Sequence, residues 1–306
     1  MMIRPEFPLQ TALFTGVVLL AATAGAVAEE PLDALFAATR SGDVEKIKTL
    51  VTTSPTLVNE KNRYGDTPLF AAVENMKLEA AKTLLGAGAS IQGTFRRDWQ
   101  MLHAVAFFGE PGEITPKRRK AMAALLIEHG ADPSAANEDG TTPLHMAVMK
   151  ARMELLVLFV ISKANINAKD ARESTPLHYA ARFGHPEVIV WLVKHGAKPN
   201  LPDRLGNTPL HDAVTRFKKE AAFALIKAGA DTNARNDLRR TPLHLTAING
   251  RQIDEVDALM AEVADVMLAN GADRHAWDDA NWTTMKYAKK NGRVQVIAVL
   301  ESYASR

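Results

Sequence analysis

The residues of this chain best suited to chemistry near neutral pH are its nine histidines, because an imidazole can serve as a general base, a general acid or a metal ligand. His129 and His195 each precede a glycine that ends a helical pattern, where a ring N–H suits the last carbonyls. His185 and His275 stand outside any pattern. The other five share the last place of one recurring four-residue motif: His103, His145, His178, His211 and His244. A position set by a repeat predicts a structural role in every copy.

The sequence contains none of the motifs that place reactive groups together. It has no His-Glu-x-x-His, no Gly-x-Ser-x-Gly, no phosphate-binding glycine loop followed by lysine and no EF-hand loop. It also has no cysteine, which excludes thiolate nucleophiles, disulfides and cysteine-bound zinc. We therefore expect no catalytic residue, no metal ligands and no cofactor. A hydrolase or metal-binding protein is the alternative with the least support.

Composition and charge narrow the class of partner. The 306 residues are 47% hydrophobic and 24% charged, which is typical of a folded protein with a sizeable core. The formal net charge is only +2. A protein that binds nucleic acid needs many lysines and arginines to neutralise phosphates. We expect no nucleic-acid partner.

The N-terminus has the pattern of a secretory signal peptide. Arg4 precedes an apolar run from Thr11 to Ala24, and Ala26-Val27-Ala28 offers small residues for a signal peptidase. We expect cleavage after residue 28, leaving residues 29–306 as a single domain. The alternative is an uncleaved membrane anchor, but this apolar run is shorter than the ~20 residues that span a bilayer and no basic stop follows it. No further stretch has spanning length, so we expect no membrane insertion after cleavage. The periplasm is the expected location, and secretion is the second choice.

The strongest feature of the chain is an internal repeat. Thr-Pro-Leu-His begins at Thr142, Thr175, Thr208 and Thr241, each 33 residues after the last. Weaker copies extend the series in both directions, and two of the spacings are 42 residues. The anchors fall at 33, 67, 100, 142, 175, 208, 241 and 283. Eight repeats account for the chain after the signal peptide.

This pattern resembles the ankyrin repeat family. Threonine can cap the first helix of a repeat, proline fits its first turn and leucine faces the core. The resemblance implies an all-α solenoid of about eight helix-turn-helix repeats with projecting β-hairpin loops. Glycine ends most second helices, where a left-handed residue is favoured, but Lys163 takes its place in the repeat anchored at Thr142. We expect a strained or altered turn near Ser162 to Asn165.

Two insertions account for the 42-residue spacings. In the third repeat, residues 109–120 contain two prolines and two glycines, which predicts a loop with a basic exit. In the seventh, residues 253–270 have apolar residues at helical spacing, which predicts a longer second helix with an acidic flank. Either insertion is a tolerated surface addition or an accessory contact on the edge opposite the hairpins. The acidic flank consists of Asp254, Glu255, Asp257, Glu262 and Asp265.

The resemblance also implies where a partner would bind. In ankyrin repeats the concave face is built from hairpin tips just before the anchor and from positions seven and eight after it. Here the pattern at those positions is arginine plus aromatic residues, which are the types enriched at the hot spots of protein interfaces. The alternative is that the tips are ordinary polar turns and that Phe107 or Phe183 packs inside. The candidate binding residues are Arg63, Tyr64, Arg96, Arg97, Trp99, Phe107, Phe108, Lys150, Arg172, Arg182, Phe183, Arg204, Leu205, Arg216, Leu238, Arg240 and Trp282.

These observations predict an exported, non-enzymatic protein-binding module. It would recognise a periplasmic or envelope protein through the concave face and protect, localise or inhibit it. The excess of arginine at the hairpins predicts a partner with an acidic face, and we expect the module itself to be a monomer. Two alternatives stay open: an immunity-type inhibitor of a toxin that acts in the periplasm, and a structural scaffold of the envelope.

Overall fold

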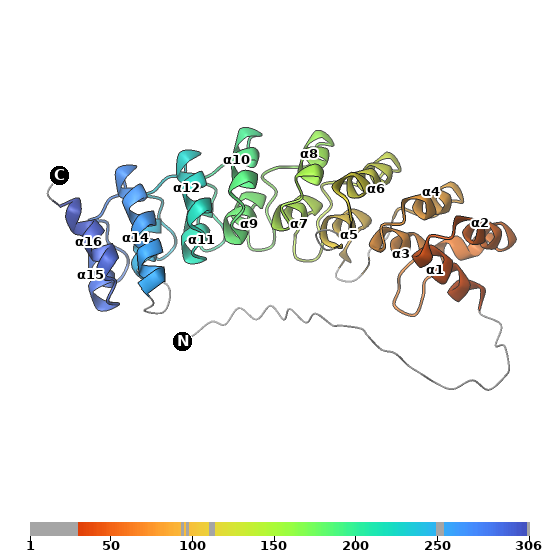
Figure 1. The fold of residues 1–306 in the computed structure, drawn as a ribbon, viewed down its shortest axis with the longest axis horizontal. Coiled ribbons are helices and arrows are strands. Elements are labelled where there is room, and N and C mark those ends of the chain that lie inside the picture. The colour runs from red at the N-terminus through yellow and green to blue at the C-terminus, as the bar shows by residue number, and fades with distance from the viewer. Residues whose placement is uncertain (1–29, 93–94, 96–97, 110–113, 249–253, 305–306) are drawn as a thin grey trace, which may run out of the picture.

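The computed structural model describes residues 30–92, 95, 98–109, 114–248 and 254–304. Within these ranges the chain forms sixteen α-helices and one 3-10 helix, and the only β pairing is two isolated bridges. The helices pair into repeats that stack into an arc, with the second helices along its outer side (Figure 1). This confirms the all-α solenoid. The expected signal peptide, residues 1–28, lies outside the described residues, as do Arg96 and Arg97.

Each repeat contributes two antiparallel helices. The first helices are α1 (Pro31–Ser41), α3 (Pro68–Glu74), α5 (Met101–Phe107), α7 (Pro143–Met149), α9 (Pro176–Phe183), α11 (Pro209–Thr215), α13 (Pro242–Ile248) and α15 (Thr284–Lys290). The second helices are α2 (Val44–Thr53), α4 (Leu78–Gly86), α6 (Pro116–Glu128), α8 (Met153–Ile161), α10 (Pro186–Lys194), α12 (Lys219–Lys227), α14 (Asp254–Ala269) and α16 (Val294–Ser302). The 3-10 helix η1 (Pro55–Asn59) follows α2.

The repeated motif starts the first helices as its residue types require. From the second repeat onward the helix begins one residue after the anchor, and at Thr67 the hydroxyl accepts the N–H of Phe70. The first repeat lacks the threonine cap. There α1 begins ahead of its anchor, at Pro31, because proline is tolerated in a first turn where no N–H is needed.

The motif histidines join each repeat to the next. The N–H of Thr142 donates to Nδ1 of His145 at 3.2 Å, so the proton lies on Nε2, which donates to the Ser174 carbonyl at 3.1 Å. The other four form the matching bond to a carbonyl of the following hairpin. Burial lowers the pKa of His145 and of His211 to about 4, so these rings are neutral at pH 7. The structural role predicted for the five histidines is confirmed.

Of the two outcomes expected near Ser162 to Asn165, the strained turn is confirmed, because Lys163 has a left-handed backbone, and the altered turn is wrong, because the hydrogen bonds are regular. Lys163 adopts φ 72°, its N–H donates to Val160, and the N–H of Ala164 donates to Phe159. The glycine-ended turn at Gly196 has the same two hydrogen bonds. The lysine therefore keeps the family geometry and carries the cost of a left-handed backbone, which is about 1–2 kcal/mol for a residue with a Cβ.

The first insertion differs from its prediction. Thr115 caps α6, so residues 117–120, expected to be the basic exit of a loop, form the first turns of a helix. One of them, Arg119, is buried and pairs with Glu154 at 3.0 Å. The side chain of Arg152, also buried, donates to the carbonyls of Val105, Phe107 and Gly109 and so fixes the end of α5. Residues 110–113 lie outside the described ranges.

The second insertion forms the longer helix that was predicted, since α14 has 16 residues. Its acidic flank is smaller than expected. Asp257 is buried, and its carboxylate accepts the N–H groups of Gln295 and Val296 at 2.8 and 3.4 Å. It therefore stabilises the start of α16 instead of facing solvent. In the part of the chain that the structure describes, no helix has both the length and the apolarity that crossing a bilayer requires.

Candidate protein-binding surface

The loops between repeats are tight hairpins built on a single side chain. In the hairpin before α9, Oδ1 of Asp170 accepts the N–H groups of Arg172 and Ser174, both at 2.8 Å. The backbone closes the same turn, because Asp170 N–H donates to Ser174 at 3.0 Å. Asparagine and aspartate are favoured here because their short side chains can bond to the backbone two residues on. The tip residues are thus held in one geometry.

Neighbouring hairpins are also bonded to one another. The N–H of Arg204 donates to the carbonyl of Arg172 at 2.9 Å, and that of Asp237 donates to Leu205 at 3.0 Å. The same bond joins Ala171 to Asp139 and Asp279 to Leu238. We call the tips of these successive hairpins, which lie between residues 139 and 279, the hairpin row. A partner that binds there meets a surface that is already ordered, which lowers the entropy cost of binding.

About half of the candidate residues are exposed at the tips or on the inner helices. Leu205 and Leu238 project from adjacent hairpins with exposed fractions of 63% and 51%, and Tyr64 is exposed to 62%. Arg204 and Arg239, which adjoin these two leucines in the sequence, are exposed as well. The exposed candidates are Arg63, Tyr64, Lys150, Arg172, Phe183, Arg204, Leu205, Arg216 and Leu238.

Two candidate arginines are engaged within the chain. Arg182 pairs with Asp212 of the next repeat at 2.7 Å, and its side chain is 22% exposed. Arg240 donates to Asp278 and to the Tyr287 hydroxyl, each at 3.2 Å. The pKa of Asp278 is lowered: burial raises it, but hydrogen bonds from Tyr287, from the Trp282 N–H and from Arg240 outweigh burial. These arginines hold neighbouring repeats together, a use that the sequence pattern did not reveal.

The candidate aromatic residues near the first insertion form a cluster. The Trp99 and Phe107 rings meet edge to face at 5.0 Å between centroids, and Phe108 lies 5.6 Å from Phe107. All three are half-buried, and Nζ of Lys150 lies 4.9 Å from the Phe107 ring. Phe107 therefore packs mainly within the chain, as the alternative interpretation allowed, while Lys150 covers the cluster on its solvent side.

Sequence reasoning missed an aromatic contribution at the C-terminal end of the hairpin row. Trp277 is 46% exposed, and the Arg239 guanidinium stacks 4.4 Å from its ring. Nearby, the half-buried candidate Trp282 lies beneath the ammonium groups of Lys286 and Lys290, at 4.3 and 4.7 Å. The signal available in the sequence was a second tryptophan five residues before Trp282, within the same arginine-rich hairpin region.

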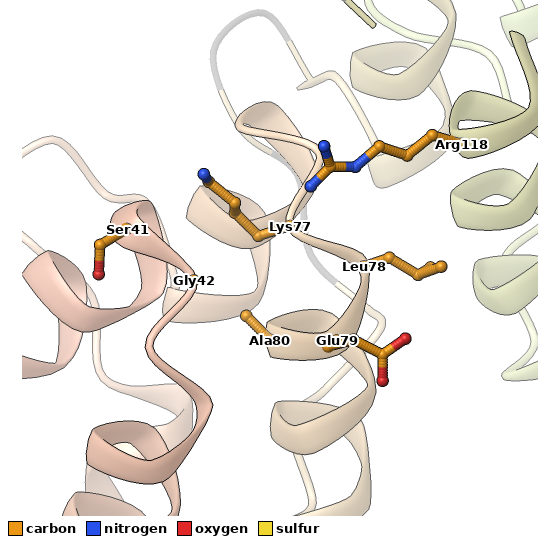
Figure 2. A pocket seen from close by; sticks show the side chains of 7 residues that line it. All are labelled: Ser41, Gly42, Lys77, Leu78, Glu79, Ala80 and Arg118. Carbon is orange, nitrogen blue, oxygen red and sulfur yellow. The ribbon is translucent and has the colours of Figure 1, made fainter. Parts of the chain in front are cut away.

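No three His, Asp or Glu side chains within the described ranges gather closely enough to hold a metal ion. A shallow open hollow of about 350 Å³ lies at the turns between first and second helices, away from the hairpins. Figure 2 shows the Arg118 side chain extending over it toward the side occupied by Lys77. The hollow is lined by Ser41, Gly42, Lys77, Leu78, Glu79, Ala80 and Arg118.

Family models match most of the chain. A model described as ankyrin repeats (3 copies) matches residues 11–94, 149–236 and 210–305. A second, described as ankyrin repeats (many copies), matches residues 114–160. Together the matched segments contain every anchor from 33 to 283 except that at residue 100, and the anchor at 142 lies in the segment of the second model alone.

Curated relatives match over shorter segments. Protein phosphatase 1 regulatory subunit 27 of Mus musculus is 32% identical over 114 residues, which are 37% of this chain and 68% of that protein. Ankyrin repeat and SOCS box protein 9 of Homo sapiens is 30% identical over 33% of this chain and 31% of its own length. E3 ubiquitin-protein ligase KEG of Arabidopsis thaliana is 26% identical over 42% of this chain, but only 7% of that protein is spanned. From its repeats, its fold and these matches, the chain belongs to the ankyrin repeat family.

Proposed function

We propose that this protein is an exported, non-enzymatic binding module that recognises another protein through the hairpin row and the inner helices. The observation that carries the proposal is the row itself, in which backbone bonds fix successive tips and leave apolar and cationic side chains exposed. The ankyrin family supports it, since its repeats are protein-binding modules. The relatives named as a regulatory subunit and as a SOCS box protein are consistent with a role in recognition.

The chemistry of the row defines the partner. Arg172, Arg204, Leu205 and Leu238 are exposed at the hairpin tips, and Arg216 is exposed at the end of the inner helix α11. The planar guanidinium of arginine binds a carboxylate through two hydrogen bonds, and covering an exposed leucine favours binding because it removes apolar surface from water. A protein surface that offers carboxylates around an apolar side chain fits this row. We propose a periplasmic or envelope protein, which binding would protect, localise or inhibit.

The export part of the proposal has a direct test. Residues 1–28 have the composition of a cleaved signal peptide. Expression of the full chain in a Gram-negative host, followed by fractionation and mass spectrometry of the intact protein, should find a product that begins at Glu29 in the periplasmic fraction. A full-length product in the cytosol would contradict export while leaving the binding proposal intact.

The binding part is tested by affinity capture from a periplasmic extract. The triple variant Arg172→Ala, Leu205→Ala, Leu238→Ala removes three side chains that are exposed at successive hairpin tips. Lys48→Ala with Lys82→Ala on the outer helices is the matched control. One protein that the wild type and the control retain and the triple variant loses would support the proposal. Equal capture by all three would contradict it.

A further inference from the structure

The outward face of the second helices changes character in the middle of the solenoid. In the repeats without an insertion, positions 12, 15 and 19 after the anchor lie on one face of the second helix, because they are separated by three and four residues. In α2 and α4 this face is polar: Lys48 pairs with Glu45, and Lys82 pairs with Glu79, both at 2.8 Å. In α8, α10 and α12 the position of those lysines is apolar and holds Val157, Val190 and Phe223.

These apolar residues form a stripe that faces solvent. Val190 is 54% exposed, Ile161 at the end of α8 is 71% exposed, and Val157 and Phe223 are half-buried. The helices that carry them lie side by side in the middle of the outer side of the arc (Figure 1). Exposed apolar residues are ordinary when scattered, but a row of them on one face indicates a surface that another molecule covers.

Opposite charges flank the stripe along its two edges. Glu187 and Glu220 are exposed near the N-terminal ends of α10 and α12, and Lys194 and Lys227 are exposed at the C-terminal ends. Among the described residues neither Glu187 nor Lys194 forms an ion pair within the chain. An acidic edge and a basic edge on either side of an apolar centre are complementary to the same surface turned through 180°.

We propose that a second copy of this chain covers the stripe, with a two-fold axis that runs along the solenoid. This rotation sets each of α8, α10 and α12 antiparallel to its own counterpart. Val190 then meets Val190 of the partner subunit, and Glu187 faces Lys194 of the partner subunit twice, as an isologous interface requires. Antiparallel helices also place their dipoles favourably. A two-fold axis perpendicular to the solenoid would instead set glutamate against glutamate.

The shape of the molecule agrees with this arrangement. Two outward-curving surfaces touch only near their middles, which is where Val157, Val190 and Phe223 lie, while α2 and α4 keep their ion pairs. The dimer leaves both hairpin rows free, on opposite sides. It replaces the monomer expected from the sequence. Because the dimer links two binding faces, it would hold a partner that has two binding sites more tightly than one face does, without any additional type of contact.

The absence of cysteine makes a specific test available. Val190→Cys places a thiol beside its own counterpart at the proposed axis, so mild oxidation should convert most of the protein into a disulfide-linked dimer that a reductant reverses. Leu205→Cys is the matched control, because that residue is as exposed but lies at a hairpin tip. Equal cross-linking of both variants, or none of Val190→Cys, would overturn the proposal. Circular dichroism establishes that both variants fold.

Charge exchange tests the orientation. Sedimentation equilibrium should show a concentration-dependent dimer for the wild type. Glu187→Lys or Lys194→Glu alone should weaken the dimer by about tenfold or more, because each creates two like-charge contacts. The double variant re-forms both pairs with reversed polarity and should recover the wild-type dissociation constant. A wild type that remains a monomer at several hundred micromolar, or a double variant weaker than either single one, would overturn the proposal.

Discussion

Acid should unfold this protein through its histidines. The pKa values of the five motif histidines are all lowered from the ordinary 6.5, chiefly by burial. A base whose native pKa lies below its unfolded pKa binds its proton in the unfolded state first. The stabilisation from these rings is therefore complete above pH 6.5 and is lost as the pH falls toward the native pKa.

The magnitude can be worked out for the two rings whose native pKa is about 4, His145 and His211. With an unfolded pKa of 6.5, the free energy of unfolding falls by about 2 kcal/mol per ring between neutral pH and pH 5. The two together remove about 4 kcal/mol, a large part of the stability of an ordinary domain. His103, His178 and His244 shift in the same direction and add to this loss.

The assay is denaturant unfolding followed by circular dichroism at a series of pH values from 7.5 to 5. The expected result is that the free energy of unfolding falls as the pH falls, with a slope that corresponds to about two or more protons taken up on unfolding. The double variant His145→Gln, His211→Gln should have a much smaller slope. A free energy of unfolding that is constant between pH 7 and pH 5 in the wild type would show that the buried histidines do not control acid unfolding.

Three further changes test single contacts. Lys163→Gly should raise the unfolding free energy by about 0.5–1 kcal/mol, because relief of the left-handed strain exceeds the added chain entropy; an unchanged or lower melting temperature would contradict it. Arg152→Gln should lower the unfolding free energy by about 3 kcal/mol, because it leaves buried carbonyl groups at the end of α5 without hydrogen-bond donors. A loss below about 1 kcal/mol in urea unfolding would show that the guanidinium is dispensable. Gly206→Ala should weaken the capture of the partner and lower the melting temperature more than Gly65→Ala does. Both glycines have positive φ, but only at Gly206 would an added Cβ lie 2.8 Å from the backbone nitrogen of Asp237. Equal melting temperatures of the two variants would rule out that clash.

The repeat period predicted most of the fold because each copy carries its own signals. The threonine cap, the proline of the first turn and the helix-ending glycine all act within a few residues, so the sequence alone locates the helices. Predictions failed where the deciding partner lies in another repeat. Asp257 reads as one more acid on an amphipathic helix, and only the position of α16 makes it a buried cap.

The binding surface was harder to predict for the same reason. Register identifies which residues stand at hairpin tips, and Leu205 and Leu238 are exposed as expected. It does not tell whether an arginine at such a position faces a partner or its own neighbour. Arg182 is held by Asp212, thirty residues further along the chain, and no local pattern marks that pair. Trp277 was missed because it lies on the arm of a hairpin, outside the two positions that register examines.

The histidine bonds also determine how this protein would respond to a pulling force. They connect the third to the eighth repeat in series, from His103 to the hairpin at Trp282. The first two repeats have phenylalanine at the same position, Phe36 and Phe70, so their joints lack that bond. Tension applied between the ends would therefore detach the first two repeats before it separates the repeats that the histidine hydrogen bonds join. Each 33-residue repeat that gives way would lengthen the chain by about 110 Å. The molecule thus has a compliant N-terminal end, formed by its first two repeats, and is stiffer from the third repeat to the eighth.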